Sequence, residues 1–119
     1  MESRHSLLKS FGFAFEGLKA AILRGRNFRI QLAIGALAIT LGAILKLDST
    51  EWLDLVIIIT LVLILELVNT SIEALVDLVS PEIQEKAKLA KDVAATTVLI
   101  ASIGSVVIGV LLFLPKLLK

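Results

Sequence analysis

Residues 53–79 read LDLVIIITLVLILELVNTSIEALVDLV, a stretch that is strongly apolar yet interrupted by polar side chains. A helix of about 20 apolar residues crosses the hydrocarbon core of a bilayer. This stretch therefore predicts a membrane span that is longer than a bilayer requires. A charge at the bilayer centre costs at least about 2.5–3.5 kcal/mol. Glu66, Asn69, Glu73 and Asp77 therefore need a specific reason to stand there.

The overall composition also points to a membrane protein. Of the 119 residues, 57% are hydrophobic, against about 45–50% in a typical soluble domain. The length fits a single domain over residues 1–119. The chain has no cysteine and only one histidine, His5, which excludes disulfides, a cysteine nucleophile, a histidine-based triad and a multi-histidine metal site. A net charge of +1 gives no reason to expect a nucleic-acid partner.

Three further segments complete the expected fold, which is all-α. Residues 6–24 place Leu7, Phe11 and Phe15 at helical spacing, the pattern of an amphipathic helix in the membrane interface. A helix of a soluble bundle is the alternative interpretation. Transmembrane helices are expected over residues 28–47, 53–79 and 93–114. Arg29 and Gln31 can reach back to the interface, and Trp52 stands where an interfacial anchor would sit. Pro81 and the charged loop 82–92 follow the second span. Pro115 closes the third span.

The distribution of lysine and arginine predicts the orientation in the membrane. The N-terminal segment carries six of them, including Arg4, and the 80–92 loop carries three, while the 46–54 connection has only Lys46. The N-terminus and the 80–92 loop are therefore expected to face the cytoplasm. Lys116 and Lys119 then lie on the other side, against this rule. No compact apolar core and cleavage site follow the N-terminus, so we expect it to remain in the mature protein.

Small residues in two spans predict where helices approach each other closely. Ala101, Ser105 and Gly109 recur every four residues in the third span, and Ala38 and Gly42 do so in the first. Such spacing lets helix backbones come together in lipid.

The polar residues of the second span share one face of the helix. At about 100° per residue, Glu66, Asn69, Glu73 and Asp77 fall within an arc of about 80°. A stripe of this kind must face other helices or a water-filled cleft rather than lipid. Three interpretations are open at this point: an active site, a proton or ion pathway, and structural packing that includes charge pairs with Lys86, Lys88 or Lys91.

The layout of these residues suits phosphate transfer to a lipid. Glu66 is the deepest, Glu73 and Asp77 lie nearer the membrane surface, and Lys91 and Asp92 can return to that surface after the loop. Mg²⁺ takes oxygen ligands and usually arrives with phosphates, lysine suits the phosphates themselves, and a deep carboxylate suits a general base. The sequence has no P-loop and no kinase-type glycine-rich loop, so any ATP site must be unconventional.

The segment ELVNTSIEALVD (residues 66–77) followed by AKDVAATTVL (90–99) resembles the prokaryotic diacylglycerol kinase / undecaprenol kinase family. RNFRI (26–30) and FGFAFEGLKAA (11–21) resemble the N-terminal blocks of that family. The resemblance covers nearly the whole chain. The residues of these motifs resemble the undecaprenol kinase branch more than the diacylglycerol kinase branch. Undecaprenol is therefore the expected substrate, and diacylglycerol is the alternative.

The resemblance implies a homotrimer of three-span subunits in the bacterial plasma membrane, which uses Mg-ATP to phosphorylate a lipid hydroxyl. It implies that Glu66 is the general base and that Glu73 is a metal ligand near the ATP phosphates. Asn69 matches a further active-site position, as do Asp77, Lys91 and Asp92, the last two on the nucleotide side. The rival from another class is a non-catalytic or ion-conducting trimer with a degenerate site.

One position departs from the family pattern. Before RN the family usually carries a glutamate, described as a second metal-coordinating carboxylate, and here Gly25 takes that place. Metal binding would then rest on Glu73, water and the phosphates. The loop EIQEKAK (82–88) also lacks the His-Pro often found there. Replacing Gly25 by glutamate is expected to lower the Mg²⁺ requirement.

Overall fold

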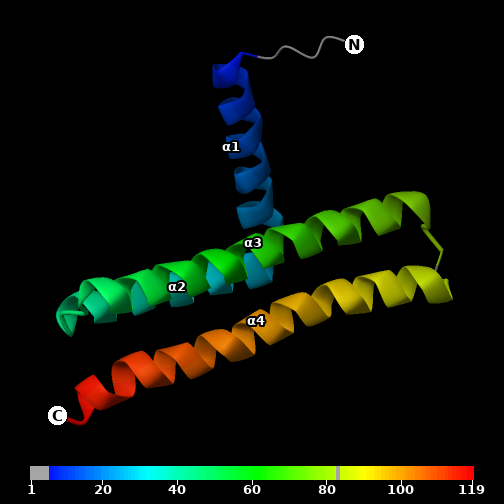
Figure 1. Cartoon of the computed structure of the whole chain (residues 1–119). Coiled ribbons are helices and arrows are strands. Elements are labelled where there is room, and N and C mark those ends of the chain that lie inside the picture. Colours follow the sequence, from blue (N-terminus) through cyan, green and yellow to red (C-terminus); the bar gives the residue numbers. More distant parts are fainter. Residues whose placement is uncertain (1–5, 83) are drawn as a thin grey trace.

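The computed structural model describes residues 6–82 and 84–119, and this part of the chain is all-α (Figure 1). The helices are α1 (Leu7–Arg24), α2 (Arg26–Ile44), α3 (Ser49–Val79) and α4 (Glu85–Leu117). The last three are each long and apolar enough to cross a membrane. The predicted fold class is thus confirmed. Arg4 and His5 lie outside the described residues.

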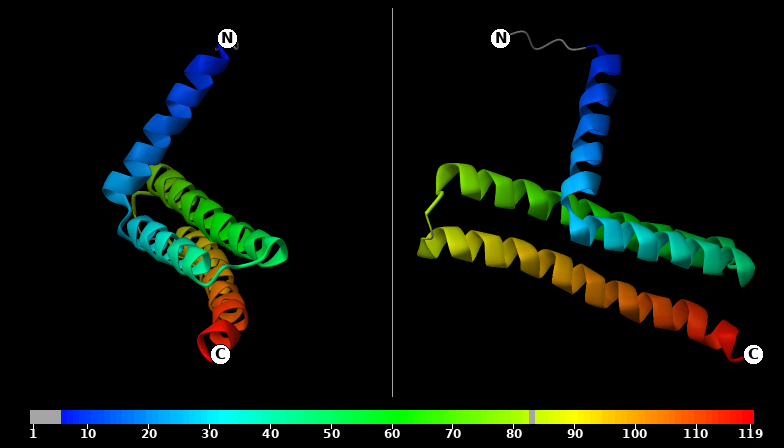
Figure 2. Two further views of the ribbon diagram at one scale, coloured as in Figure 1. Left: turned by 90° about the vertical axis from the view of Figure 1, so that its left-hand side faces the viewer. Right: turned by 180° about the vertical axis from the view of Figure 1, so that it is seen from behind.

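The helix α1 stands apart from the bundle that the other helices form. Both views of Figure 2 show α1 crosswise to α2, α3 and α4, which run roughly along one direction. Its large apolar side chains, among them Phe11, Phe13 and Phe15, are exposed. A bundle that crosses a bilayer would therefore lay α1 along the membrane surface, where an apolar face is buried among lipid headgroups.

The turn between α1 and α2 is held by hydrogen bonds to the end of α1. Gly25 ends α1 and begins α2, and its N–H donates to the carbonyl of Ala21 (2.8 Å). The Arg29 guanidinium Nη1 donates to the carbonyls of Ile22 (2.7 Å) and Leu23 (3.2 Å). These carbonyls belong to the last turn of a helix and have no partner within it. Arg29 therefore both reaches the interface, as expected, and fixes the angle of α1.

At the opposite end of the bundle, α3 begins with a capping box. Asp48 Oδ1 accepts the N–H of Glu51 (2.9 Å), and Glu51 Oε1 accepts the N–H of Asp48 (3.1 Å). The same Glu51 oxygen pairs with Lys116 Nζ of α4 (3.1 Å). Lys116, which opposes the orientation rule, is thus neutralised by a carboxylate from the preceding helix.

The charged segment after Pro81 differs from its prediction. Residues 85–92, expected to be part of a loop, form the first two turns of α4. Their composition favours a helix, and Lys88 and Asp92 form an ion pair four residues apart. At its other end α4 continues past Pro115 to Leu117, where the Lys116–Glu51 pair holds the last turn. Pro115 therefore does not close the helix.

The one cluster of buried apolar side chains found among the described residues lies at one end of the bundle. Leu47, Leu55, Ile58 and Leu112 form a buried cluster, and Trp52 packs against it near the start of α3. Gly42 lies close to the side chains of Leu47 and Trp52, as its spacing predicts. An added Cβ would lie 2.9 Å from Leu47 Cδ1 and 3.0 Å from Trp52 Cη2. Most other large apolar side chains of α2, α3 and α4 are exposed, as expected for helices surrounded by lipid or by further copies.

Glu51 joins two helix ends, and its substitution tests that role. Glu51→Gln keeps a side chain that can complete the capping box but loses the ion pair, which costs about 0.2–1 kcal/mol. Glu51→Ala also loses the side-chain hydrogen bond, which adds about 0.5–1.5 kcal/mol. We expect the thermal unfolding midpoint in detergent to fall in the order wild type, Glu51→Gln, Glu51→Ala. Equal midpoints for the two variants would contradict the capping role.

Candidate active site

The helix lengths place the polar residues of α3 at the membrane surface rather than in the bilayer centre. The 19 residues of α2 span about 28 Å, close to the hydrocarbon thickness of about 30 Å. The start of α2 lies level with Glu66, since Asn27 and Glu66 line one pocket. Residues 49–66 of α3 span about 27 Å on the same measure. Glu66 therefore lies at the edge of the hydrocarbon core, and the rest of α3 projects beyond it.

The position of α1 supports this placement of Glu66 at the edge of the hydrocarbon core. Ala14, Leu18 and Arg24 of α1 line a hollow together with Thr70 and Ser71 of α3. A helix lying in the membrane surface thus passes α3 one turn beyond Glu66. Glu66 is the deepest of the four polar residues of α3, as expected from the sequence, and this arrangement puts it about one helical turn from the level of α1.

Glu66 is the most buried of the polar side chains of α3. It is only 5% exposed, and no hydrogen bond or ion pair of its carboxylate is found within residues 6–82 and 84–119. A pocket of about 310 Å³, here called the Glu66 pocket, borders it. Side chains of α2, α3 and α4 line this pocket: Asn27, Gln31, Glu66, Asn69, Ala95, Val98, Leu99 and Ser102.

Asn69 leaves a second polar atom without a partner in this pocket. Its Nδ2 donates to Glu73 Oε1 (3.3 Å), but its buried Oδ1 has no hydrogen-bond partner among the described residues. Buried polar groups in native proteins are nearly always paired. The pocket therefore holds two proton acceptors, the Glu66 carboxylate and Asn69 Oδ1, to which no described residue donates.

A second hollow, here called the Asp77 cleft, lies at the turn between α3 and α4. It has a volume of about 260 Å³ and is lined by Asp77, Lys91, Asp92, Lys88 and neighbouring residues of the turn. Lys91 and Asp77 form an ion pair across the two helices, and Asp92 pairs with Lys88 (2.5 Å). All four side chains are well exposed, so neither pair contributes much to stability.

The structure thus sorts the predicted site residues into two groups. Glu66 and Asn69 border the Glu66 pocket, whereas Asp77, Lys91 and Asp92 border the Asp77 cleft. Glu73 is exposed and is connected to the first group through Asn69. From Glu66 to Asp77 the helix rises about 16 Å. Charge pairing with lysines explains Asp77, but the described residues offer no ion pair to Glu66 or Glu73.

The residues present fit a magnesium ion that arrives with phosphates. No group of three or more histidine, cysteine, aspartate or glutamate side chains is gathered for a metal within the described residues. Mg²⁺ does not need such a cage, because it is usually held by one or two carboxylates plus water and phosphate oxygens. The Glu73 carboxylate and the unpaired Asn69 Oδ1 are oxygen ligands of the kind it takes.

Gly25 has a structural reason of its own. An added Cβ would lie 2.7 Å from the carbonyl oxygen of Ala21 and 3.2 Å from Cβ of the buried Phe28. A side chain at this position would push on the backbone of α1. The glycine therefore permits the close turn between α1 and α2, whatever its consequence for metal binding.

Sequence reasoning did not find the contribution of α2 and α4 to the Glu66 pocket. Gln31, which was expected to reach the interface, points into the bundle, where its Nε2 donates to Ser102 Oγ of α4 (3.5 Å). Asn27 lines the same pocket. The two α2 residues are four apart and thus share one helix face, a signal that the apolar background of the span obscures.

Comparisons with known proteins find similar sequences over most of the chain. The sequence model of the family described as prokaryotic diacylglycerol kinase matches residues 12–113. A diacylglycerol kinase of Synechocystis sp. is 44% identical over 115 residues, which cover 96% of this chain and 66% of that protein. An undecaprenol kinase of Bacillus subtilis is 38% identical over 109 residues (92% and 89%). A diacylglycerol kinase of Escherichia coli K12 is 34% identical over 101 residues (85% and 83%). Relatives named for either lipid thus match, and the undecaprenol branch is not favoured.

Proposed function

Because the chain belongs to the prokaryotic diacylglycerol kinase family, we propose that it transfers the γ-phosphate of Mg-ATP to the hydroxyl of a membrane lipid. It is then a phosphotransferase with an alcohol acceptor, built into a bacterial membrane through three helices. The observation that carries this proposal is the buried, unpaired carboxylate of Glu66 at the edge of the hydrocarbon core. A lipid hydroxyl reaches that level without leaving the bilayer.

In the proposed reaction Glu66 is the general base. The oxygen of the lipid hydroxyl bonds to the γ-phosphorus while the bond from that phosphorus to ADP breaks, and Glu66 accepts the hydroxyl proton. Asn69 holds the Glu73 carboxylate through Nδ2 and offers Oδ1 to the reacting groups. Glu73 would hold Mg²⁺, which when bound offsets the charge on the phosphate oxygens. Positioning and charge supply most of the catalysis in phosphoryl transfer.

The nucleotide is assigned to the solvent side of the same helices. Lys91 in the Asp77 cleft is half-buried and has a partner, Asp77, that it can exchange for a phosphate. Asp77 pairs with this lysine and Asp92 lines the same cleft, so both are assigned to the nucleotide side as well. Glu73 lies between this cleft and the Glu66 pocket along α3, where a bound triphosphate would have to extend.

Three further properties belong to the proposal. The lipid is undecaprenol, with diacylglycerol as the alternative; the comparisons support a lipid acceptor of either kind. The N-terminus faces the cytoplasm, which the Glu51–Lys116 pair supports because it neutralises one lysine on the other side. The chain assembles as a homotrimer, which would cover part of the exposed apolar surface of α2, α3 and α4.

The arrangement supports a kinase over an ion or proton pathway. A pathway needs polar groups from one membrane surface to the other. Beyond Glu66, toward the Phe113 end of the bundle, the hollow between the helices is lined almost entirely by apolar side chains. The polar stripe therefore ends at Glu66, which suits a reaction at one surface.

Phosphate transfer from labelled Mg-ATP in mixed micelles tests the proposal directly, with undecaprenol and diacylglycerol offered separately. We expect transfer to one or both lipids and a loss of about 10²–10⁴-fold in kcat for Glu66→Gln. The variant keeps the shape of the side chain but cannot accept the proton. Its oligomeric state should match that of the wild type. No transfer to either lipid by a folded wild-type protein would refute the proposal.

Lys91 tests the nucleotide side. Lys91→Gln removes a charged phosphate contact, which at about 1.5–3 kcal/mol raises the KM for Mg-ATP roughly 10–100-fold. Lys86→Gln is the matched control, because Lys86 is exposed and does not line the Asp77 cleft. An equal rise of KM in both variants would show a general charge effect in place of a specific contact.

Gly25 can be tested with two substitutions that share the same steric problem. Gly25→Ala should lower the unfolding midpoint, since its Cβ meets the Ala21 carbonyl. Gly25→Glu adds a carboxylate to that change. We expect half-maximal activity at a lower Mg²⁺ concentration for Gly25→Glu than for Gly25→Ala. The same Mg²⁺ dependence in both would remove the position from the metal site.

A further inference from the structure

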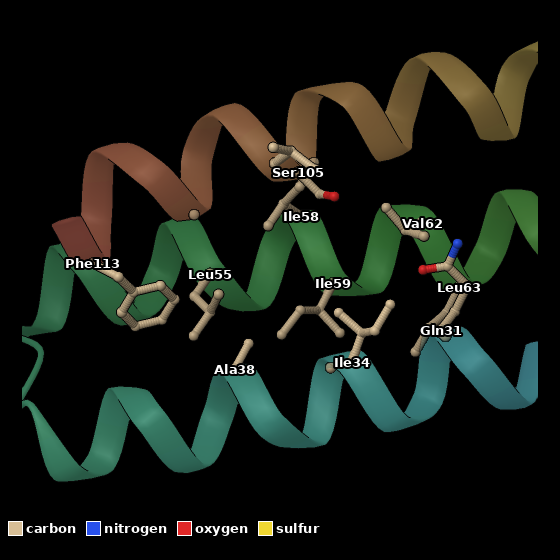
Figure 3. A pocket seen from close by; sticks show the side chains of 13 residues that line it. Gln31, Ile34, Ala38, Leu55, Ile58, Ile59, Val62, Leu63, Ser105 and Phe113 are labelled. Atoms are coloured by element: carbon tan, nitrogen blue, oxygen red, sulfur yellow. The ribbon is translucent and has the colours of Figure 1, made fainter.

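An apolar groove lies between α2, α3 and α4 (Figure 3). It has a volume of about 180 Å³ and is lined by residues of α2, α3 and α4, nearly all of them apolar. Gln31 lines both hollows, and the side chains in Figure 3 show the groove running from Gln31 to Phe113. The Glu66 pocket and this groove are therefore neighbouring hollows, one partly polar and one apolar, that meet at Gln31.

One face of α3 lines both the apolar groove and the Glu66 pocket. Leu55, Ile58 and Val62 line the groove, and Glu66 and Asn69 continue the same row at spacings of three and four residues. From Leu55 to Glu66 the helix rises about 16 Å. A molecule that lay along this face would contact hydrocarbon over most of its length and a carboxylate at one end.

Missing side chains on α4 create the room in the groove. Gly109 lines it, and an added Cβ at this position would have nothing within 4 Å in the described part of the chain. Gly109 therefore makes no close helix contact within one copy, although its spacing predicted one. An apolar cavity of about 150 Å³ can hold a molecule of the size of benzene, so the groove has room for a section of one hydrocarbon chain.

We propose that this groove binds one hydrocarbon chain of the substrate lipid and thereby directs its hydroxyl to Glu66. The inference rests on the proposed function and names the lipid class: an uncharged alcohol with a long chain, whether isoprenoid or acyl. Glu66 and Asn69 Oδ1 lack partners at the polar end, and a hydroxyl can supply one. An anionic phospholipid would instead bring its phosphate toward the carboxylates of Glu66 and Glu73, which repel it. Once Glu66 has given up the proton it accepted, the same repulsion acts on the phosphorylated product.

Two leucine substitutions on α4 separate this binding site from general effects. Gly109→Leu fills the groove without an immediate clash, whereas Gly104→Leu adds the same side chain at an equally open position that does not line it. Trp52 is the single tryptophan of the chain and packs against the buried cluster that includes Leu55, a residue that lines the groove. Chain-brominated alcohols bound in the groove should therefore quench its fluorescence, a readout independent of catalysis.

We expect a brominated long-chain prenol or a brominated diacylglycerol to quench Trp52 saturably in wild type and Gly104→Leu. In Gly109→Leu the half-saturating concentration should rise at least tenfold. Comparing the two lipids identifies which kind of chain the groove accepts. With the corresponding unbrominated lipids, Gly109→Leu should raise the lipid KM of phosphate transfer and leave the KM for Mg-ATP unchanged.

Two results would overturn the inference: equal quenching curves for the two leucine variants, or a change of oligomeric state confined to Gly109→Leu, which would assign the groove to a second copy of the chain. Saturable quenching that Gly109→Leu abolishes, without phosphate transfer by the wild type, would support the groove as a chain-binding site and refute the kinase. The two proposals therefore fail in different ways.

Discussion

The structure depends on the cost of placing a carboxylate in hydrocarbon. The helix α3 carries Glu66 after about 18 residues that span about 27 Å, so the charge emerges where the hydrocarbon core ends. A span of 19 residues in α2 and the crosswise helix α1 fix the membrane surface at the same level. The remaining polar residues of α3 then lie in the headgroup region and in water. The helix α3, which is too long and too polar for a membrane span alone, therefore consists of a span followed by a segment that projects beyond the hydrocarbon core.

Hydrogen bonds at the helix ends hold the helices at fixed positions relative to one another along the bundle. A bilayer offers no water to unpaired backbone groups, so each helix end must find partners in the protein or the interface. Arg29 supplies them for the end of α1, and Asp48 with Glu51 supplies them for the start of α3. The Glu51–Lys116 pair adds a connection between α3 and α4 at the end opposite the polar residues. The site is therefore held from both ends of a bundle whose interior packing is thin.

Hydropathy and periodicity predict the helices, their order and the polar face of α3, because these are properties of a single helix. They do not predict which neighbouring helix faces that stripe, and so Asn27, Gln31 and Ser102 stay hidden among apolar residues. The depth of Glu66 also escapes them, since it depends on where α2 begins relative to α3. The helical start of α4 at Glu85 is accompanied by the Lys88–Asp92 ion pair, whereas a count of charges alone interprets the segment as a loop. The roles of Glu73 and Gly25 toward a metal rest on family resemblance and remain predictions.

The space between α2, α3 and α4 has a polar pocket at Glu66 and an apolar groove. This separation helps to explain why the acidic motif does not identify the lipid. Relatives named for diacylglycerol and for undecaprenol both match this chain, and both lipids present a hydroxyl to the same carboxylate. The chemistry at Glu66 is therefore common to them, whereas the hydrocarbon chains differ in length and branching. If the groove holds one of those chains, the choice of lipid is made by apolar and small residues such as Ala38 and Gly109. Substrate specificity within this fold would then be set by packing along the span, at a distance from the residues that carry out the transfer.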